Sequence, residues 1–335
     1  DVFNLAVSDG AGGIVATGYQ DDADIPGNYF NDAYFPVVRI DAEGKVLWYR
    51  REKPGTGDSG KGGDAQAIIR DADGNFVITG VLANGLASSM DNFLIKIDPN
   101  GQTLWFQNYL IPGVALTPMG VEQTADGGYV MFGNDEADWP LSTRLQKVDA
   151  NGNTEWIKAY PFEDDVTPNG MSDWALLPDG GFLWLGTLSG YDADSNYVTR
   201  PTLTRLDAQG NLVWRKMLEI GSLVSPGRLI VTPDGGYVFT GEVITGPNAT
   251  HWQLLLAAAD ADGNLLWWKN FDARTTTSGV ALRRRANGQL LVAGQTQTNN
   301  WLYNLAGVLL LADENGVLGA PLPPLVQPSA LSVWP

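Results

Sequence analysis

The sequence predicts an all-β fold, a six-bladed β-propeller made of four-stranded antiparallel blades. Three observations predict it. Two short motifs alternate six times along the 335 residues, each repeat holds four short β-type segments, and no segment shows sustained helical periodicity. Repeats of this kind, with four strands each, are typical of propellers. We therefore expect one domain over residues 1–335.

The first motif reads Asp-x-x-Gly-x-x-x-Trp. A sixth copy, at Asp313 and Gly316, lacks the Trp. The complete copies begin at Asp41, Asp98, Asp149, Asp207 and Asp260 and end at Trp48, Trp105, Trp156, Trp214 and Trp267. The mean period between Asp41 and Asp313 is about 54 residues. Because the same Trp recurs around the predicted ring, we interpret it as packing between blades.

The second motif reads Asp-Gly-Gly-aromatic-apolar-x-x-Gly. Its clear copies span residues 126–133, 179–186 and 234–241, and weaker copies span 73–80, 287–294 and 11–18. Gly permits positive φ, and Asp or Asn caps a turn through its side chain. Both motifs therefore predict tight hairpin turns. We interpret the Asp-rich turns at 71–75 and 260–264 as turns rather than calcium loops, because they lack the further carboxylates.

The four strands of a blade are expected to be 4 to 6 residues long, as at 228–231, 237–240, 93–97 and 103–106. The expected blades are residues 1–51, 64–109, 119–160, 171–218, 227–271 and 278–320. Residues 321–335 form a tail, which we expect to pack on the ring with Trp334 partly buried. A Lys or Arg comes two residues before the Asp in four repeats, and we expect local pairing with carboxylates: Arg39, Lys96, Lys147 and Arg205.

The spacings distinguish two faces. Asp lies seven residues before the closing Gly or the Trp in every complete copy, whereas the other connections vary between 16 and 25 residues. In antiparallel blades the constant turns fall on one face and the variable loops on the other. Variable loops on a rigid scaffold commonly carry binding sites, so we expect the site on the loop face.

Composition excludes several classes of function. The chain has no Cys and one His, which excludes disulfides, Cys nucleophiles and histidine-rich metal sites. Its net charge of −17 disfavours nucleic acids and anionic membrane surfaces. The sequence contains no run of 18 apolar residues, so it predicts no membrane-spanning helix.

The repeat units resemble those of secreted bacterial propeller proteins that are common in Bacteroidetes-type exported and surface proteins. Phe76, Tyr129, Phe182 and Tyr237 occupy the aromatic position of that pattern. The Gly-x-x-x-Trp element also resembles the tryptophan-docking motif of quinoprotein propellers, which have eight blades and one more residue between Asp and Gly. The resemblance implies a propeller located outside the cell, at the cell surface or in the periplasm.

The loop face is predicted to be acidic and aromatic. Aromatic rings stack on sugars and carboxylates bind hydroxyls, so we expect a glycan or protein ligand. The expected ligand-binding residues are Tyr29, Tyr34, Trp139, Tyr191, Tyr197, Trp252, Trp301 and Tyr303. Asp192, Asp194 and Asn196 have the opening spacing of a calcium loop and are the candidate Ca²⁺ ligands, although Tyr197 stands where Gly is expected. A lone His251 on a loop is interpreted as incidental.

Three functions remain open from the sequence. The main expectation is an exported, non-catalytic, monomeric propeller that binds a glycan or protein partner. The first alternative is a polysaccharide hydrolase or lyase that uses loop-face carboxylates. The second is a structural spacer module of a surface protein. No catalytic residue is singled out, because the acidic loops supply many candidates.

Overall fold

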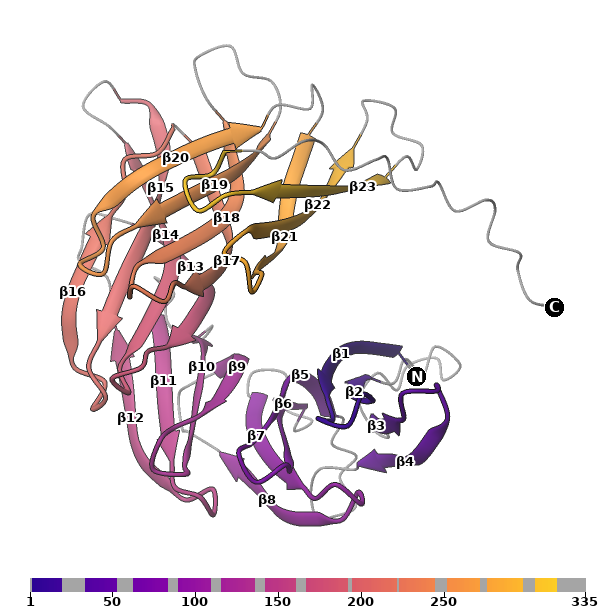
Figure 1. Cartoon of the computed structure of the whole chain (residues 1–335). Helices are drawn as coiled ribbons and strands as arrows, with labels where there is room; N and C mark the ends of the chain where they lie inside the picture. The colour runs from indigo at the N-terminus through magenta and orange to yellow at the C-terminus, as the bar shows by residue number, and fades with distance from the viewer. Residues whose placement is uncertain are drawn as a thin grey trace, which may run out of the picture. The chain divides into compact units, whose positions relative to one another are not determined.

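A computed structural model describes residues 2–19, 34–52, 63–83, 90–109, 116–135, 142–160, 167–191, 195–221, 223–244, 252–271, 276–297 and 305–317 (Figure 1). Within these residues, 23 strands form six antiparallel sheets. The same residues contain no helix that could cross a bilayer. Contacts divide the chain into two compact units, Asp1–Glu163 and Asp164–Pro335.

The first unit contains three four-stranded sheets, each with its strands paired in chain order. Their strands are β1 Val2–Ser8, β2 Ile14–Tyr19, β3 Phe35–Ile40 and β4 Val46–Glu52; β5 Gly63–Arg70, β6 Phe76–Ala83, β7 Met90–Ile97 and β8 Thr103–Tyr109; β9 Leu116–Gln123, β10 Tyr129–Asp135, β11 Ser142–Val148 and β12 Thr154–Tyr160.

The second unit contains two four-stranded sheets and one sheet with three described strands. Their strands are β13 Thr167–Leu176, β14 Phe182–Tyr191, β15 Tyr197–Leu206 and β16 Leu212–Met217; β17 Leu223–Val231, β18 Tyr237–Ile244, β19 Gln253–Ala259 and β20 Leu265–Phe271; β21 Thr276–Arg284, β22 Leu290–Gln297 and β23 Leu305–Ala312. The expected all-β architecture of four-stranded antiparallel sheets is thus confirmed for five repeats. The tail with Trp334 lies outside the described residues, so its packing stays a prediction.

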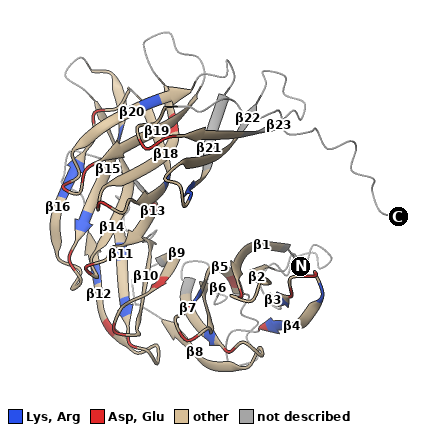
Figure 2. Ribbon diagram, in the orientation of Figure 1, with Lys and Arg blue, Asp and Glu red and all other residues tan. Residues whose placement is uncertain are grey.

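The hairpin turns have the geometry that the motifs predict. In the turn of the first motif at Asp41, the Gly44 N–H donates to the Asp41 carbonyl, and Gly44 has a φ of 86°. The Asp41 carboxylate accepts hydrogen bonds from the backbone N–H groups of Glu43 and Lys45. Left-handed φ favours Gly, and the carboxylate satisfies donors that the turn leaves free. Figure 2 shows these acidic turns in red at the ends of hairpins.

The closing Gly of the second motif is required for a different reason. In each sheet the first strand carries a register shift, or β-bulge, next to this Gly. A Cβ on Gly133 would lie 2.1 Å from the Thr117 carbonyl oxygen, and one on Gly80 would lie 2.0 Å from the Asp64 carbonyl oxygen. The bulge therefore brings a backbone oxygen so close that only Gly fits.

The repeated Trp packs between sheets, as the sequence predicts. A Cβ added to the turn Gly of the following sheet would lie only 2.5 to 3.0 Å from the indole ring. This holds for Trp48 with Gly101, Trp105 with Gly152, Trp214 with Gly263 and Trp267 with Gly316. The Trp48 indole N–H also donates to the Pro99 carbonyl at 2.9 Å. Each of these Trp residues thus joins its sheet to the next sheet in the sequence.

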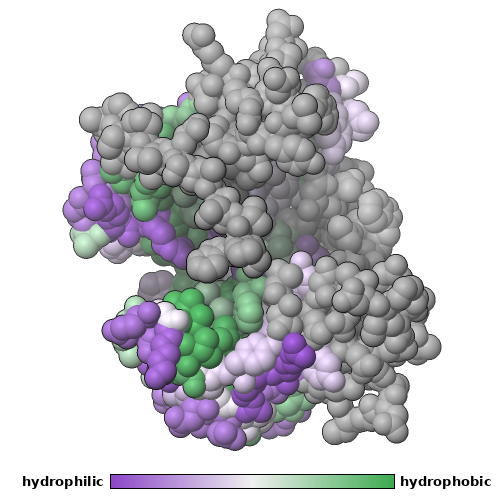
Figure 3. Space-filling model, turned by 90° about the vertical axis from the view of Figure 1, so that its right-hand side faces the viewer, coloured by the Kyte–Doolittle hydropathy of each residue, from purple (hydrophilic) through white to green (hydrophobic). Residues whose placement is uncertain are grey.

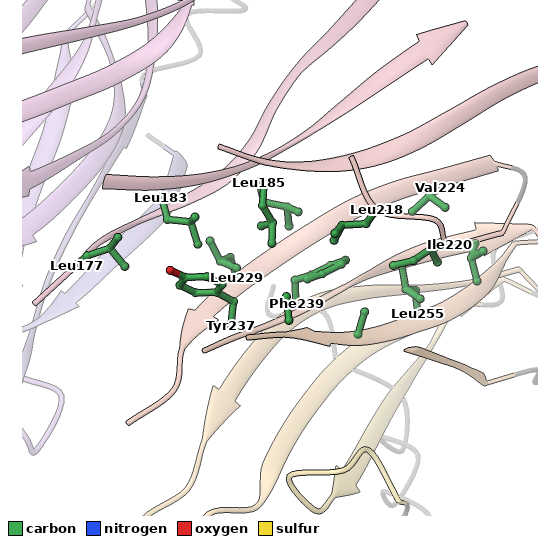
Figure 4. Packing of buried hydrophobic residues seen from close by; sticks show 14 residues of the cluster. Leu177, Leu183, Leu185, Leu218, Ile220, Val224, Leu229, Tyr237, Phe239 and Leu255 are labelled. Carbon is green, nitrogen blue, oxygen red and sulfur yellow. The ribbon is translucent and has the colours of Figure 1, made fainter. Parts of the chain in front are cut away.

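Apolar side chains fill the space between neighbouring sheets. In the second unit, Leu183 and Leu185 of β14 face Leu229 of β17 and Phe239 of β18 in one buried cluster (Figure 4). In the first unit, the sheet of β1–β4 leaves one face uncovered by the rest of that unit. Phe3, Ile14, Val46 and Tyr49 are exposed there and line a shallow apolar hollow; Figure 3 looks onto this side and shows its hydrophobic surface in green.

Candidate functional site at the long-loop ends of the strands

The two ends of each sheet differ as the spacing predicts. Tight turns join the first strand to the second and the third to the fourth at one end, which we call the turn end. At the other end, the long-loop end, the first strand begins and the second strand ends, next to the variable loops. Residues 20–33, 53–62 and 136–141 of these loops lie outside the described residues. The candidate site is therefore built from the strand ends.

Four of the eight expected ligand-binding residues are described, and all four lie at long-loop ends. Tyr34 precedes β3, Tyr191 ends β14, Tyr197 begins β15 and Trp252 precedes β19. Tyr34 belongs to the first unit and the other three to the second. The remaining predictions fall outside the described residues and stay predictions: Tyr29, Trp139, Trp301 and Tyr303, together with His251.

The structure brings Tyr191 and Tyr197 together. They pair across the β14–β15 hairpin, with ring centroids 5.7 Å apart and ring planes at 70°. Tyr191 is 76% exposed and Tyr197 is 51% exposed. An edge-to-face pair of this kind is held in place by its own contact and still presents ring faces to solvent. It offers a fixed aromatic surface for an amphipathic ligand such as a sugar.

The expected calcium ligands are only partly described. Asp192 and Asp194 lie outside the described residues, and Asn196 is exposed next to Ser195, which has a φ of 63°. The described part of the chain contains no cluster of three or more His, Asp or Glu side chains that could hold a metal ion.

Sequence reasoning missed Asp64. It lies at the long-loop end of β5, one residue beyond Ala65, which is the residue paired with the closing Gly80. The β-bulge between Ala65 and Ala67 and the absence of a side chain on Gly80 together fix the backbone of Asp64, whose carbonyl oxygen approaches Gly80. Bulges commonly re-aim a side chain near a functional site.

The Asp64 carboxyl is partly buried and poorly satisfied. Its Oδ1 atom is buried without a hydrogen-bond partner, and its Oδ2 atom accepts one long hydrogen bond, of 3.3 Å, from the Gln66 amide. Burial raises the pKa of this carboxyl, because the ionised form loses solvation. A buried acid with a raised pKa, next to variable loops, is the kind of group that active sites use as a proton donor.

The equivalent position is polar in other repeats. The residue that follows the closing Gly on the second strand pairs with one residue of the first strand. These first-strand residues are Asp64, opposite Val81; Thr117, opposite Asn134; and Ser225, opposite Glu242. Asp64 is the acidic member of this series. The sequence contains a pattern that could have indicated Asp64: a polar residue lies seven positions before the turn that follows the first strand. This pattern points to a buried position only when the β-bulge is already known.

A second acid on a first strand is Asp173 of β13. Its Oδ2 atom accepts a hydrogen bond of 2.8 Å from the Leu229 N–H of β17, and Arg228 Nη1 lies 3.6 Å from its Oδ1 atom. Burial raises its pKa against the effect of these partners. Because Asp173 bonds to the backbone of the next sheet, we interpret it as an inter-sheet contact.

Two further buried polar groups lie at the long-loop end of the third sheet. Ser142 and Thr143 begin β11, and they are 6% and 1% exposed. Their hydroxyl oxygens have no hydrogen-bond partner. Unsatisfied buried polar atoms are costly and commonly mark a functional surface or an unseen partner. In the first unit, such atoms therefore gather at the end that the sequence predicts to be functional.

No model of a known protein family matches the sequence, and no curated protein matches it. Solved structures do match. An α-L-arabinanase of Penicillium chrysogenum, complexed with arabinobiose, is 14% identical, with 89% of each chain covered and a TM-score of 0.54. The periplasmic gluconolactonase of Pseudomonas aeruginosa is 15% identical over 81% of this chain and 69% of its own, with a TM-score of 0.48. A GH43 β-1,3-galactosidase is 10% identical over 94% of this chain and 74% of its own, with a TM-score of 0.42.

These comparisons correct the main functional expectation. The sequence favoured a non-catalytic module that binds a glycan or protein partner, whereas the similar arabinanase is an enzyme. We therefore abandon the non-catalytic expectation. The expectation arose because the acidic loops offered many carboxylates and their sequence selected none of them. The likeness to the arabinanase shows that the fold is a β-propeller.

Proposed function

We propose that the protein is a polysaccharide hydrolase, with Asp64 as the general acid. The observation that carries the proposal is the carboxyl of Asp64, which is partly buried, has one oxygen without a partner and has a raised pKa. A glycosidase needs one carboxyl that keeps its proton near neutral pH and delivers it to the leaving-group oxygen. A raised pKa moves Asp64 toward this protonated form.

The substrate class follows from charge and aromatic surface. A net charge of −17 disfavours polyanionic polysaccharides, so a neutral polysaccharide is the better substrate. The exposed Tyr191–Tyr197 pair supplies a surface on which sugar rings can stack. Arabinan is the first substrate to test, because the similar arabinanase was solved with arabinobiose.

We also propose that the propeller has six blades. Six sheets within the described residues support this number. We propose that this monomer acts outside the cell, as the resemblance to secreted bacterial propeller proteins implies.

Turnover measurements test the proposal. The chain should release reducing ends from at least one neutral polysaccharide in a panel that includes arabinan. Asp64→Asn should lower kcat about 10²- to 10⁴-fold, because the proton donor is lost. Asp41→Asn, at the turn end, is the matched control and should leave kcat unchanged. Absence of turnover on the whole panel, or full turnover by Asp64→Asn, would refute the proposal.

A further inference from the structure

The turn end of the sheets has a recurring ion pair. In four sheets, the third strand carries a Lys or Arg that pairs with a carboxylate of the turn after the first strand. The pairs are Arg39–Asp9 at 2.9 Å, Lys96–Asp71 at 2.9 Å, Lys147–Asp126 at 3.0 Å and Arg205–Asp179. They confirm the local pairing that the sequence predicts for these cations.

The fifth sheet lacks this cation. Ala258 of β19 pairs with Val238, as Lys147 of β11 pairs with Val130, so Ala258 occupies the position of the cation. Asp234 occupies the position of Asp126 in the turn. No Lys or Arg of the described residues forms an ion pair with Asp234, and the sequence contains no Lys or Arg after Arg285.

The sixth sheet, next to the fifth, also lacks an aromatic side chain at the start of its second strand. In two other sheets, the aromatic residue that begins the second strand packs near the Trp of the preceding sheet, as Tyr129 does with Trp105 at 6.0 Å and Tyr237 does with Trp214 at 6.5 Å. In the sixth sheet this position, the first residue of β22, is Leu290. Two large side chains are thus replaced by smaller ones at the same junction.

A pocket of about 560 Å³ opens at that junction, wholly within the second unit. Asp234, Ala258, Trp267, Arg284, Leu290 and Glu314 are among its lining residues. Ala258 and Leu290 form part of its wall. In other repeats a cationic side chain and an aromatic ring fill the equivalent space, and the smaller side chains here leave it open. A site of this size accommodates a small molecule.

The remaining groups define the chemistry of the ligand. In the third sheet, the Thr124 hydroxyl and the Gly128 N–H both donate to Asp126 Oδ1, and Oδ2 is left for the Lys147 ammonium. Asp234 has the same partners, the Thr232 hydroxyl and the Gly236 N–H, which lower its pKa, and the charge of Arg284 on β21 lowers it further without an ion pair between the two side chains. Its second oxygen therefore has the environment that accepts an ammonium in the third sheet.

The walls suit an alkyl chain that ends in a cation. Trp267 and Leu290 are apolar. Asp234 and Glu314 together carry two negative charges, which outnumber the single positive charge of Arg284. An ammonium near an indole has a precedent in the same unit, where Lys216 Nζ lies 5.7 Å from the centre of the Trp214 ring. We propose that this pocket binds a small primary aliphatic amine, with the ammonium at Asp234 and the alkyl chain against Trp267 and Leu290.

This pocket is independent of the proposed hydrolase site. It lies at the turn end of the fifth and sixth sheets, whereas Asp64 lies at the long-loop end of a sheet in the first unit. Failure of one proposal therefore leaves the other untouched.

Butylammonium, which reproduces the end of a lysine side chain, is the probe. Titration of the full chain should raise the thermal midpoint and shift the NMR signal of the Trp267 indole N–H, with a dissociation constant on the order of 1 mM. Butan-1-ol, of similar shape and without charge, should have no such effect. An equal response to butan-1-ol would overturn the proposal.

Two variants locate the response. Ala258→Lys supplies the missing cation, so it should raise the midpoint without amine and abolish the response to butylammonium. Asp234→Asn, at an exposed turn, should keep the fold and also abolish the response. Binding that survives both Ala258→Lys and Asp234→Asn contradicts the assignment.

Discussion

The two ends of β5 carry two aspartates with opposite properties. At the turn end, Asp71 is buried and accepts bonds from the Lys96 ammonium, the Tyr129 hydroxyl and the Asn75 N–H. Burial raises its pKa, but the Lys96 ammonium and the N–H groups of Asn75 outweigh burial and hold the pKa below its ordinary value. At the long-loop end, Asp64 has burial without compensation, and its pKa rises. The same residue type is thus paired and stabilised in its ionised form just after one end of the strand, and lacks such partners at the other end.

The same contrast extends over the sheets. At the turn end, carboxylates are paired or cap turns, Trp residues pack on glycines, and spacings are constant. At the long-loop end, Asp64, Ser142 and Thr143 hold buried oxygens without partners. Stabilising contacts are thus concentrated at the end where the repeats have the same turns and spacings, and reactive groups are expected at the end where the loops differ between repeats.

The largest effect is expected at the closing Gly. Gly133→Ala places a Cβ 2.1 Å from the Thr117 carbonyl oxygen and should lower the free energy of unfolding by about 3 kcal/mol. Gly44→Ala is the control, because a Cβ there meets no atom within 4 Å and only its φ of 86° is strained. It should cost about 1 kcal/mol. Denaturant unfolding measures both, and equal losses would contradict the role of the bulge.

A smaller effect is expected at the aromatic pair. Tyr197→Ala removes the ring that holds Tyr191 and should raise the KM for a polysaccharide roughly fivefold, about 1 kcal/mol, with kcat unchanged. Steady-state kinetics on the substrate found in the panel measures this. Tyr49→Ala, which removes an exposed Tyr of the first sheet, is the matched control. A fall in kcat without a change in KM would exclude a stacking role.

The smallest effect concerns pH. Burial raises the pKa of Asp126, but the Thr124 hydroxyl, the Lys147 ammonium and the Gly128 N–H lower it to about 2 from an ordinary 3.8. The stability from this depressed pKa is present above pH 4 and is lost as the pH falls toward 2. Because the Asp126 side chain is 58% exposed, Asp126→Asn should remove less than about 1 kcal/mol of this acid dependence. Unfolding from pH 5 to pH 2 with an unchanged slope would contradict the assignment.

Sequence reasoning succeeded where the causes are local. Positive φ at Gly44, caps by Asp41 and the spacing to Trp48 all act within one turn and its neighbour, so the motif predicts them. The four-stranded sheets followed from these turns. Asp64 escaped prediction because its burial depends on a bulge and on packing from other strands, which no local motif records. The amine pocket depends on two residues, Ala258 and Leu290, that are separated in the sequence and share a wall in space.

The most direct test of the account compares the two aspartates of β5 in one experiment. Turnover and the free energy of unfolding are measured for Asp64→Asn and Asp71→Asn. The account predicts that Asp64→Asn loses turnover and keeps its stability, whereas Asp71→Asn loses about 3 kcal/mol of stability, because the buried Lys96 is left unpaired, and keeps its kcat in the folded fraction. The reverse pattern, or the same loss in both variants, would contradict the division between a structural end and a functional end.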